Sequence, residues 1–302
     1  MPEASSTIAQ ISDQLTSLAD AAAASVVAVH GGGRWSISGI HWRPGIIVTA
    51  EEALERDQEL VVTTSAGGRI PATLAGRDPT TDVAILKIAS EGLAVAANRS
   101  TTAPRAGNLI LAVGRHEEGT LAGWGLVEFA GGAWHSRRGG TIDNLIRLNM
   151  RLSPSLEGGT LIDAHGEVLG MVVSGPRGRV LAIPAATIER ATDQLLSKGH
   201  VSRGYLGAGL QPVELPAGGA GQAAGERRGV LVVSVDPSGP SARAGLMVGD
   251  VILSWNDTLV SGMRQVMQLL GPDSIAAKVR LALLRGGVPT SLEVTLGERP
   301  LQ

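Results

Sequence analysis

Short apolar runs separated by turn residues fill most of the chain from residue 25 to residue 183. Gly, Pro, Asp and Asn stand between the runs. The clearest runs cover residues 25–29, 45–48, 60–62, 82–86, 109–113 and 168–173. Runs of this length and spacing are typical of strands in an antiparallel barrel or sandwich. The pattern therefore predicts a mainly β domain over residues 25–184.

A first helix is predicted in residues 1–24, where apolar side chains recur at helical spacing. These positions are Ile8, Ile11, Leu15 and Leu18. Ser, Thr, Ala and acidic residues fill much of the remainder. The apolar stripe indicates that this segment packs on the body of the protein or on a neighbouring subunit.

A second helix is predicted over residues 185–200, where it connects two domains. Pro184 suits the start of a helix, and Lys198-Gly199 is a typical stop. The apolar stripe consists of Ile188, Ala191, Leu195 and Leu196. Residues 201–302 again alternate β-like runs with turns and include one short helix, so we expect a second domain there. Its Gly/Ala-rich insert, residues 216–229, is predicted to be a flexible loop.

Composition and charge narrow the function classes. The formal net charge of -2 creates no large basic field, so we expect no nucleic-acid partner. The absence of Cys excludes disulfides, thiolate nucleophiles and thiolate metal sites. No run approaches the roughly 20 apolar residues that cross a bilayer, and residues 1–24 lack the pattern of a secretory leader. We therefore expect a cytoplasmic protein with no membrane span and no cofactor.

Three blocks of the first β domain resemble, in order, the catalytic blocks of the HtrA/Deg family of trypsin-like serine proteases. Residues 45–54, GIIVTAEEAL, are similar to the strand and short helix that carry the catalytic His. Residues 76–87, GRDPTTDVAILK, are similar to the block of the catalytic Asp. Residues 149–161, NMRLSPSLEGGTL, are similar to the block of the nucleophilic Ser. The resemblance covers most of residues 25–198 and implies a trypsin-like double β-barrel.

Two members of the implied triad are replaced by glutamates. On this template Glu52 stands at the His position and Glu157 at the Ser position, whereas Asp82 is kept. Ser155 replaces a glycine that helps to form the oxyanion hole in the family. A serine protease needs a hydroxyl nucleophile, an imidazole base and backbone N–H groups directed at the oxyanion. The sequence therefore predicts a protease fold with no active catalytic residue.

Glu52, Asp82 and Glu157 should converge on this fold, and two arrangements remain open. In the first, the glutamates face solvent or pair with arginines such as Arg34, Arg43 or Arg151. In the second, the three carboxylates form a site for Ca²⁺, Mg²⁺ or Mn²⁺, which oxygen ligands suit. Three like charges at short range require a proton, a basic partner or a cation.

The second domain resembles the PDZ domains that follow HtrA/Deg proteases. Residues 203–207, RGYLG, are similar to the family's carboxylate-binding loop, and residues 244–253, AGLMVGDVIL, to a later turn and strand. The resemblance implies that a loop, an edge strand and a helix face bind a peptide C-terminus. The corresponding positions are Tyr205, Leu206, Gly207, Ala208, Gly209, Leu210, Met263, Val266, Met267 and Leu270. Asp250 is predicted to bond the backbone of its own turn.

The sequence predicts mainly β architecture, with a trypsin-like double β-barrel followed by a PDZ domain. The leading functional hypothesis is a catalytically inactive HtrA-like protein that binds peptides or protein C-termini as an adaptor, chaperone-like holder or assembly subunit. An active serine endopeptidase and a cation-dependent regulator are the alternatives. Homo- or hetero-oligomers are both compatible with the sequence.

Overall fold

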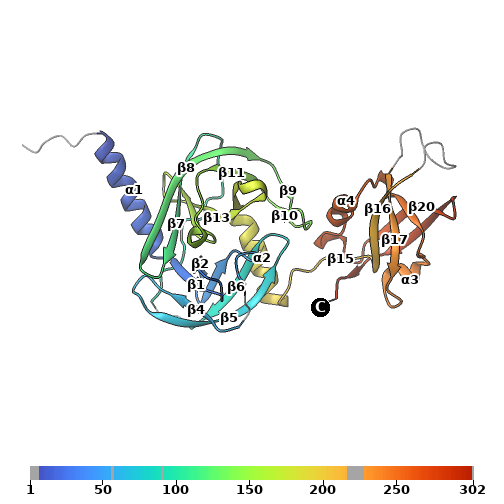
Figure 1. The fold of residues 1–302 in the computed structure, drawn as a ribbon, viewed down its shortest axis with the longest axis horizontal. Helices are drawn as coiled ribbons and strands as arrows, with labels where there is room; N and C mark the ends of the chain where they lie inside the picture. Colours follow the sequence, from blue (N-terminus) through green and yellow to red (C-terminus); the bar gives the residue numbers. More distant parts are fainter. Residues whose placement is uncertain (1–6, 56–57, 90–91, 216–227, 301–302) are drawn as a thin grey trace, which may run out of the picture. The chain divides into compact units, whose positions relative to one another are not determined.

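A computed structural model describes residues 7–55, 58–89, 92–215 and 228–300. The chain forms two compact units (Figure 1). The first comprises Met1–Trp134 and Thr141–Val201, and the second comprises His135–Gly140 and Ser202–Gln302. The predicted loop at residues 216–229 falls largely outside the described residues.

The first unit begins with helix α1 and a closed six-stranded antiparallel barrel. Its elements are α1 (Thr7–Ala23), β1 (Val26–His30), β2 (Ile37–Arg43), β3 (Ile46–Thr49), β4 (Leu60–Thr63), β5 (Arg69–Asp78) and β6 (Val83–Ile88). The strand order is β1-β2-β3-β6-β5-β4. Val and Ile dominate these short strands because branched side chains pack well on a pleated surface. The predicted apolar runs thus form the walls of the barrel.

A second closed barrel follows, again with antiparallel pairing and the strand order β11-β14-β13-β12-β7-β8. Its strands are β7 (Leu109–His116), β8 (Gly119–Gly131), β11 (Leu145–Asn149), β12 (Thr160–Asp163), β13 (Val168–Ser174) and β14 (Val180–Pro184). Shorter elements are β9 (Trp134–His135), β10 (Thr141–Ile142) and the 3-10 turns η1 (Pro154–Leu156) and η2 (Pro176–Gly178). The mainly β double barrel predicted from the sequence is confirmed.

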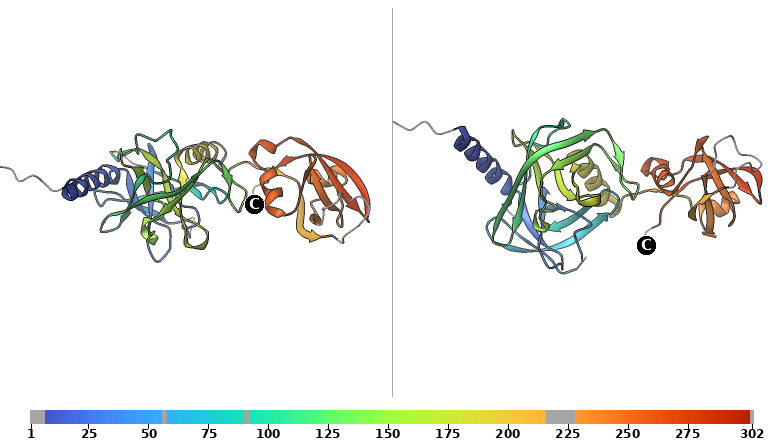
Figure 2. Two further views of the ribbon diagram at one scale, coloured as in Figure 1. Left: turned by 90° about the horizontal axis from the view of Figure 1, so that it is seen from above. Right: turned by 45° about the horizontal axis from the view of Figure 1, so that its top comes forward.

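Helix α2 (Ala185–Lys198) packs against strands of both barrels, β5 and β13 (Figure 2). The helix ends at Gly199, whose φ of 75° is left-handed and whose N–H donates to the Leu195 carbonyl oxygen. Glycine is favoured there because it has no Cβ to strain this conformation. The predicted apolar stripe and stop signal therefore mark this helix correctly.

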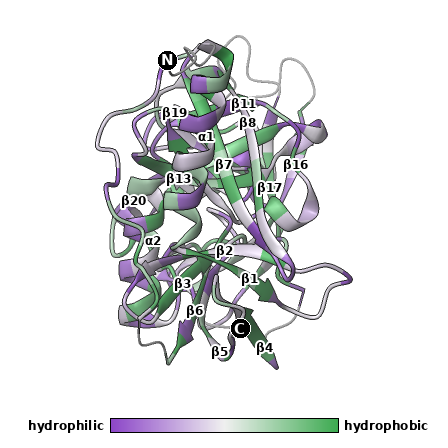
Figure 3. Cartoon of the chain, turned by 90° about the vertical axis from the view of Figure 1, so that its left-hand side faces the viewer, coloured by the Kyte–Doolittle hydropathy of each residue, from purple (hydrophilic) through white to green (hydrophobic). Residues whose placement is uncertain are grey.

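Helix α1 is amphipathic, but it is only partly covered within the first unit. Leu18 and Ala22 pack against the core, whereas Ile8 is 81% exposed and Ile11 is 49% exposed. Figure 3 shows mostly apolar residues along β1 and β4 and a mixture of polar and apolar residues along α1. Packing of the outer turns on a neighbouring subunit stays a prediction. No helix in the described part of the chain is both long enough and apolar enough to cross a membrane.

The second unit is a β-rich module with short helices. Its sheet has the order β16-β17-β18-β20-β21, with β19 paired to β18, and β15 pairs separately with β22. The strands are β15 (Gly204–Tyr205), β16 (Ala208–Glu214), β17 (Arg228–Val235), β18 (Val251–Trp255), β19 (Thr258–Leu259), β20 (Lys278–Arg285), β21 (Val288–Thr295) and β22 (Gly297–Glu298). The helical segments are α3 (Pro240–Ala244), α4 (Met263–Leu269) and the 3-10 turn η3 (Pro272–Ser274). Strand β16 is an edge strand, as β-augmentation requires.

Candidate functional site

The three carboxylates predicted to converge lie in one region of the double barrel. Glu52 follows β3, Asp82 precedes β6 and Glu157 follows η1. Asp82 Oδ1 accepts a hydrogen bond of 2.8 Å from the Glu52 N–H. Burial raises the pKa of Asp82 to about 7; the Glu52 N–H opposes this rise, and the charges of Glu52, Glu157 and Glu51 add to it. Asp82 is therefore partly protonated near neutral pH.

Glu157 is half-buried and engaged by the protein itself. Its Oε1 accepts a hydrogen bond of 2.9 Å from the N–H of Ser174, the last residue of β13. Its own N–H donates to the Pro154 carbonyl oxygen at 3.2 Å. An oxyanion hole requires backbone N–H groups directed at the reacting carbonyl. At this position that N–H is directed into the η1 turn instead.

Two glycines after Glu157 are required by close backbone packing. Gly158 has a φ of 81°, and a Cβ there would lie 2.2 Å from the Ser38 carbonyl oxygen. A Cβ on Gly159 would lie 2.6 Å from the Val113 carbonyl oxygen. The Ser155 carbonyl accepts a hydrogen bond of 2.6 Å from Ser38 Oγ, which fixes the turn from the other side. The backbone of the turn at the predicted nucleophile position is thus held in one conformation.

The structure gives no geometric support to a cation site. Within the described ranges, no group of three His, Asp or Glu side chains is placed to hold a metal ion. The carboxylate oxygens of Asp82 and Glu157 accept bonds from backbone N–H groups instead. Glu52 is exposed.

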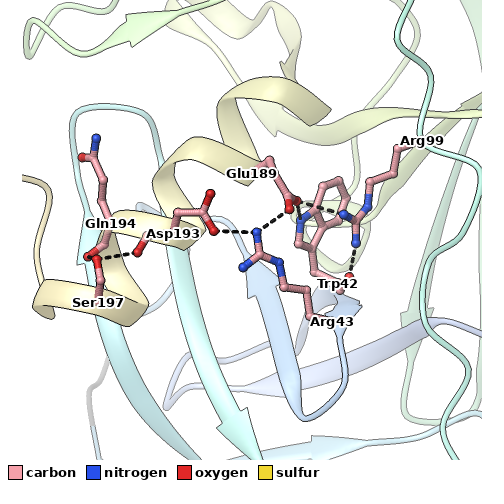
Figure 4. Close-up of polar contacts among 7 residues, drawn as sticks. All are labelled: Trp42, Arg43, Arg99, Glu189, Asp193, Gln194 and Ser197. Atoms are coloured by element: carbon pink, nitrogen blue, oxygen red, sulfur yellow. Dashed lines mark hydrogen bonds and ion pairs between the residues drawn. The ribbon is translucent and has the colours of Figure 1, made fainter.

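Arg43 does not neutralise Glu52 or Glu157, so that part of the prediction is wrong. It pairs with Glu189 and, at 2.7 Å, with Asp193, both on α2 (Figure 4). Arg99 donates to the same Glu189 carboxylate at 2.9 Å and stacks over Trp42, with 4.0 Å to the ring centroid. Sequence reasoning missed this cluster because its members lie on separate elements and carry no common motif.

The histidine nearest to Glu52 in sequence is held by backbone groups of the first barrel. The nearest histidine in sequence, His41, is buried, and its Nδ1 lies 2.8 Å from the Ala94 carbonyl oxygen. Its Nε2 accepts the Gly45 N–H at 3.1 Å. The Gly45 bond stabilises the β2–β3 hairpin, and the Ala94 contact ties β2 to the segment after β6.

A groove with a volume of about 210 Å³ lies in the second unit, between the loop after β15, strand β16 and helix α4. It is lined by Tyr205, Leu206, Gly207, Ala208, Leu210, Met263, Val266, Met267 and Leu270, together with Arg203, Gly204, Arg299 and Pro300. Every residue proposed from the sequence is present except Gly209, which pairs with Ser234 on β17. The resemblance did not point to Arg299, because no motif includes it.

The loop that closes one end of this groove is held by its carbonyl groups. The Leu206 carbonyl accepts bonds from the N–H and Oγ of Ser241, and the Gly207 carbonyl accepts one of 2.8 Å from the Asp236 N–H. The Tyr205 hydroxyl donates to Asp236 Oδ2 at 3.0 Å. Throughout the described ranges, the N–H groups of Leu206 and Gly207 find no acceptor. Two adjacent backbone donors are therefore available to an anionic ligand.

Two known protein families match parts of this chain. A family described as a trypsin-like peptidase domain matches residues 37–171, and a PDZ domain family matches residues 204–296. The chain is 30% identical over 267 residues to a probable periplasmic serine endoprotease DegP-like from Pseudomonas putida, with 85% of this chain and 54% of that protein covered. A protein of the same description from Chlamydia pneumoniae is 29% identical over 265 residues, with 85% and 53% covered. The chain belongs to the HtrA/Deg family.

Solved structures agree with this HtrA/Deg assignment. The serine endoprotease from Yersinia pestis has a TM-score of 0.72 and 26% identity, with 95% of this chain and 98% of that chain covered. The HtrA-type protease AlgW with decapeptide has a TM-score of 0.73 and 24% identity, with 95% and 99% covered, and indicates the fold alone. This HtrA/Deg chain spans about half the length of the curated relatives, 53% and 54%.

The expected cytoplasmic location is wrong. The DegP-like HtrA/Deg relatives are named as periplasmic proteins. Our expectation relied on the absence of a leader pattern in residues 1–24, and such an absence carries no physical information about where the folded domains work. The lack of Cys is compatible with either compartment.

Proposed function

We propose that this HtrA/Deg family member does not hydrolyse peptide bonds and binds protein C-termini through its PDZ domain. It would then act as an adaptor, a chaperone-like holder or an assembly subunit. The names of its relatives support a periplasmic site of action.

The chemistry at Glu52 and Glu157 supports catalytic inactivity. A carboxylate is a poor nucleophile toward an amide, and a glutamate with a reference pKa of about 4.3 is a weak base compared with an imidazole. The Glu157 N–H that would stabilise an oxyanion donates to Pro154. A negative charge at position 157 would also repel that oxyanion.

The observation that carries the binding function is the groove beside Leu206 and Gly207. Its two N–H groups without an acceptor among the described residues suit a carboxylate, and its walls of Met263, Val266 and Met267 suit an apolar side chain. One similar structure, the AlgW protease, was solved with a decapeptide. Transfer of that property to this chain is part of the proposal.

Casein digestion by the purified full chain tests inactivity. We expect no turnover from the wild type or from Glu157→Ala, with an active trypsin-like protease as the positive control. Turnover by the wild type that Glu157→Ala abolishes would establish the alternative, an active endopeptidase. Turnover that survives in Glu157→Ala would indicate a contaminating protease, which repurification removes.

Peptide binding is tested by fluorescence anisotropy with a labelled peptide, GSGSGSGLAV, as its C-terminal acid and as its C-terminal amide. Tighter binding of the acid is the expected result, because only the acid presents a carboxylate to the loop. Equal affinity for both peptides, or no binding of either, would contradict the proposed function.

Calorimetry tests the cation-dependent alternative. We expect Ca²⁺ and Mn²⁺ to give the same titrations with the wild type and with Glu52→Gln/Glu157→Gln. A saturable heat that only the wild type shows would establish a carboxylate cation site.

A further inference from the structure

We propose that Arg299 supplies the cation that pairs with the ligand's C-terminal carboxylate in the PDZ groove. The inference rests on the proposed function, since it names a further binding residue of the same site. Arg299 lies almost one hundred positions beyond the loop in sequence, roughly the length of a small domain.

Pairing of two short strands brings Arg299 to the groove. Strand β15 pairs with β22, with Gly204 opposite Glu298. The next residue, Arg299, donates its N–H to the Arg203 carbonyl oxygen at 2.9 Å. These bonds place the Arg299 backbone beside the start of the loop, and Arg299 lines the groove together with Tyr205 and Leu206.

The Arg299 guanidinium is available for a ligand. It is exposed, and it makes no ion pair or side-chain hydrogen bond with any residue that the structure describes. Burial and the Asp236 carboxylate raise the pKa of the nearby Tyr205 phenol, and the Arg299 charge opposes this rise. The positive charge therefore acts at the loop where the two backbone donors lie.

The other arginine of the groove has a different task. Arg203 is 6% exposed and donates to the Met267 carbonyl oxygen at 3.0 Å. This bond ties the start of the loop to the end of α4. Arg299 is the more accessible cation of the two, and an arginine can hold a carboxylate through two parallel N–H groups.

A double-mutant cycle between protein and peptide tests the pairing in the full chain. The Kd values of the acid and amide forms of GSGSGSGLAV are measured for the wild type, Arg299→Gln and the control Arg264→Gln. Arg264 is exposed on α4 and does not line the groove. Arg264→Gln therefore removes the same charge as Arg299→Gln but removes no group of the groove. Circular dichroism and thermal melting of each variant verify folding.

We expect Arg299→Gln to weaken binding of the acid by about 3- to 10-fold, as for a partly exposed charge-assisted contact. Binding of the amide should change by less than about twofold, and so should binding of either peptide to Arg264→Gln. Equal weakening of acid and amide by Arg299→Gln, or no weakening of the acid, would overturn the role of Arg299. If the wild type still prefers the acid in either of these outcomes, the proposed function stands and only the role of Arg299 is overturned. If the wild type shows no preference for the acid, the proposed function and the role of Arg299 are both contradicted.

Discussion

At the residue scale, Asp82 lies where the HtrA/Deg resemblance predicts the triad aspartate, and its neighbour there is Glu52. Its carboxylate bonds the Glu52 backbone, and two acidic side chains replace the neutral groups that would face it in a serine protease. Burial beside like charges favours the neutral acid. We therefore expect Asp82 to make the stability of the fold depend on pH rather than to orient an imidazole.

Asp82→Asn is expected to change how stability depends on pH. The folded pKa of about 7 lies above the unfolded value of about 3.9, so the native state binds the extra proton between these pH values. The Asp82 contribution to stability is thus present below about pH 4 and lost as pH rises through about 7. Urea unfolding gives the difference in the free energy of unfolding between the variant and the wild type. This difference should favour the variant by about 1–3 kcal/mol more at pH 8 than at pH 4.5. The control is Glu118→Gln at an exposed turn, and a variant whose pH profile matches the wild type would refute the prediction.

Gly158→Ala is expected to destabilise the first unit by about 2–4 kcal/mol, because the new Cβ would clash with the Ser38 carbonyl at a left-handed φ. Gly178→Ala is the matched control. Its φ of 70° is also left-handed, but nothing lies within 4 Å of a Cβ there, so about 1 kcal/mol is expected. Equal denaturation midpoints for the two variants would show that backbone packing at Gly158 is unimportant.

At the scale of elements, the turn that leads into β18 is stabilised by a bond within the turn and by contacts with a strand distant in sequence. Asp250 Oδ2 accepts the Met247 N–H at 2.8 Å, which confirms the bond to its own turn. Arg285 on β20 donates to both carboxylate oxygens, at 2.9 and 2.8 Å, and this contact lowers the pKa of Asp250. The turn thereby joins two neighbouring strands of the sheet.

Asp250→Ala should cost about 2–4 kcal/mol of stability, because it removes a buried carboxylate and leaves Arg285 without its main partner. Asp257→Ala is the control, since Asp257 also pairs with an arginine, Arg280, but both side chains are exposed. A cost of at most about 1 kcal/mol is expected there. Chemical denaturation of the variants, each compared with the wild type and followed by circular dichroism, measures both losses. Similar losses would argue against a special role for the buried pair.

At the scale of the whole molecule, the two compact units carry separate parts of the predicted chemistry. The triad positions belong to the first unit and the groove to the second. Each unit has its own buried core, built around residues such as Trp42 in the first and Trp255 in the second. The proposed binding of a peptide C-terminus therefore involves none of the carboxylates of the double barrel.

Met267→Glu is expected to weaken binding of the acid peptide by more than about 10-fold, because it places a negative charge in an apolar groove. Glu52→Gln/Glu157→Gln should leave the Kd within about twofold, since these residues lie in the other unit. Anisotropy titrations of the full chain measure both effects. A double-barrel variant that loses peptide binding would contradict this division of function.

Much of the architecture was predictable because it depends on local patterns. Short apolar runs between turn residues gave the strands, and a period of 3.6 with Lys198-Gly199 gave α2. The HtrA/Deg blocks also located Glu52, Asp82 and Glu157, since family motifs preserve their order around the site. The predicted groove residues came from a loop motif, the strand after it and the apolar face of one helix, and all of them except Gly209 line the groove.

The sequence by itself determined most strands, the main helices and the family, because neighbours along the chain encode them. Only the tertiary structure decided which partners the charged groups have. Arg43 pairs with α2, Glu157 bonds the end of β13, and Arg299 reaches the groove through the pairing of β15 with β22. Contacts of this kind join residues far apart in the chain, and their energies depend on burial and direction that no local pattern records.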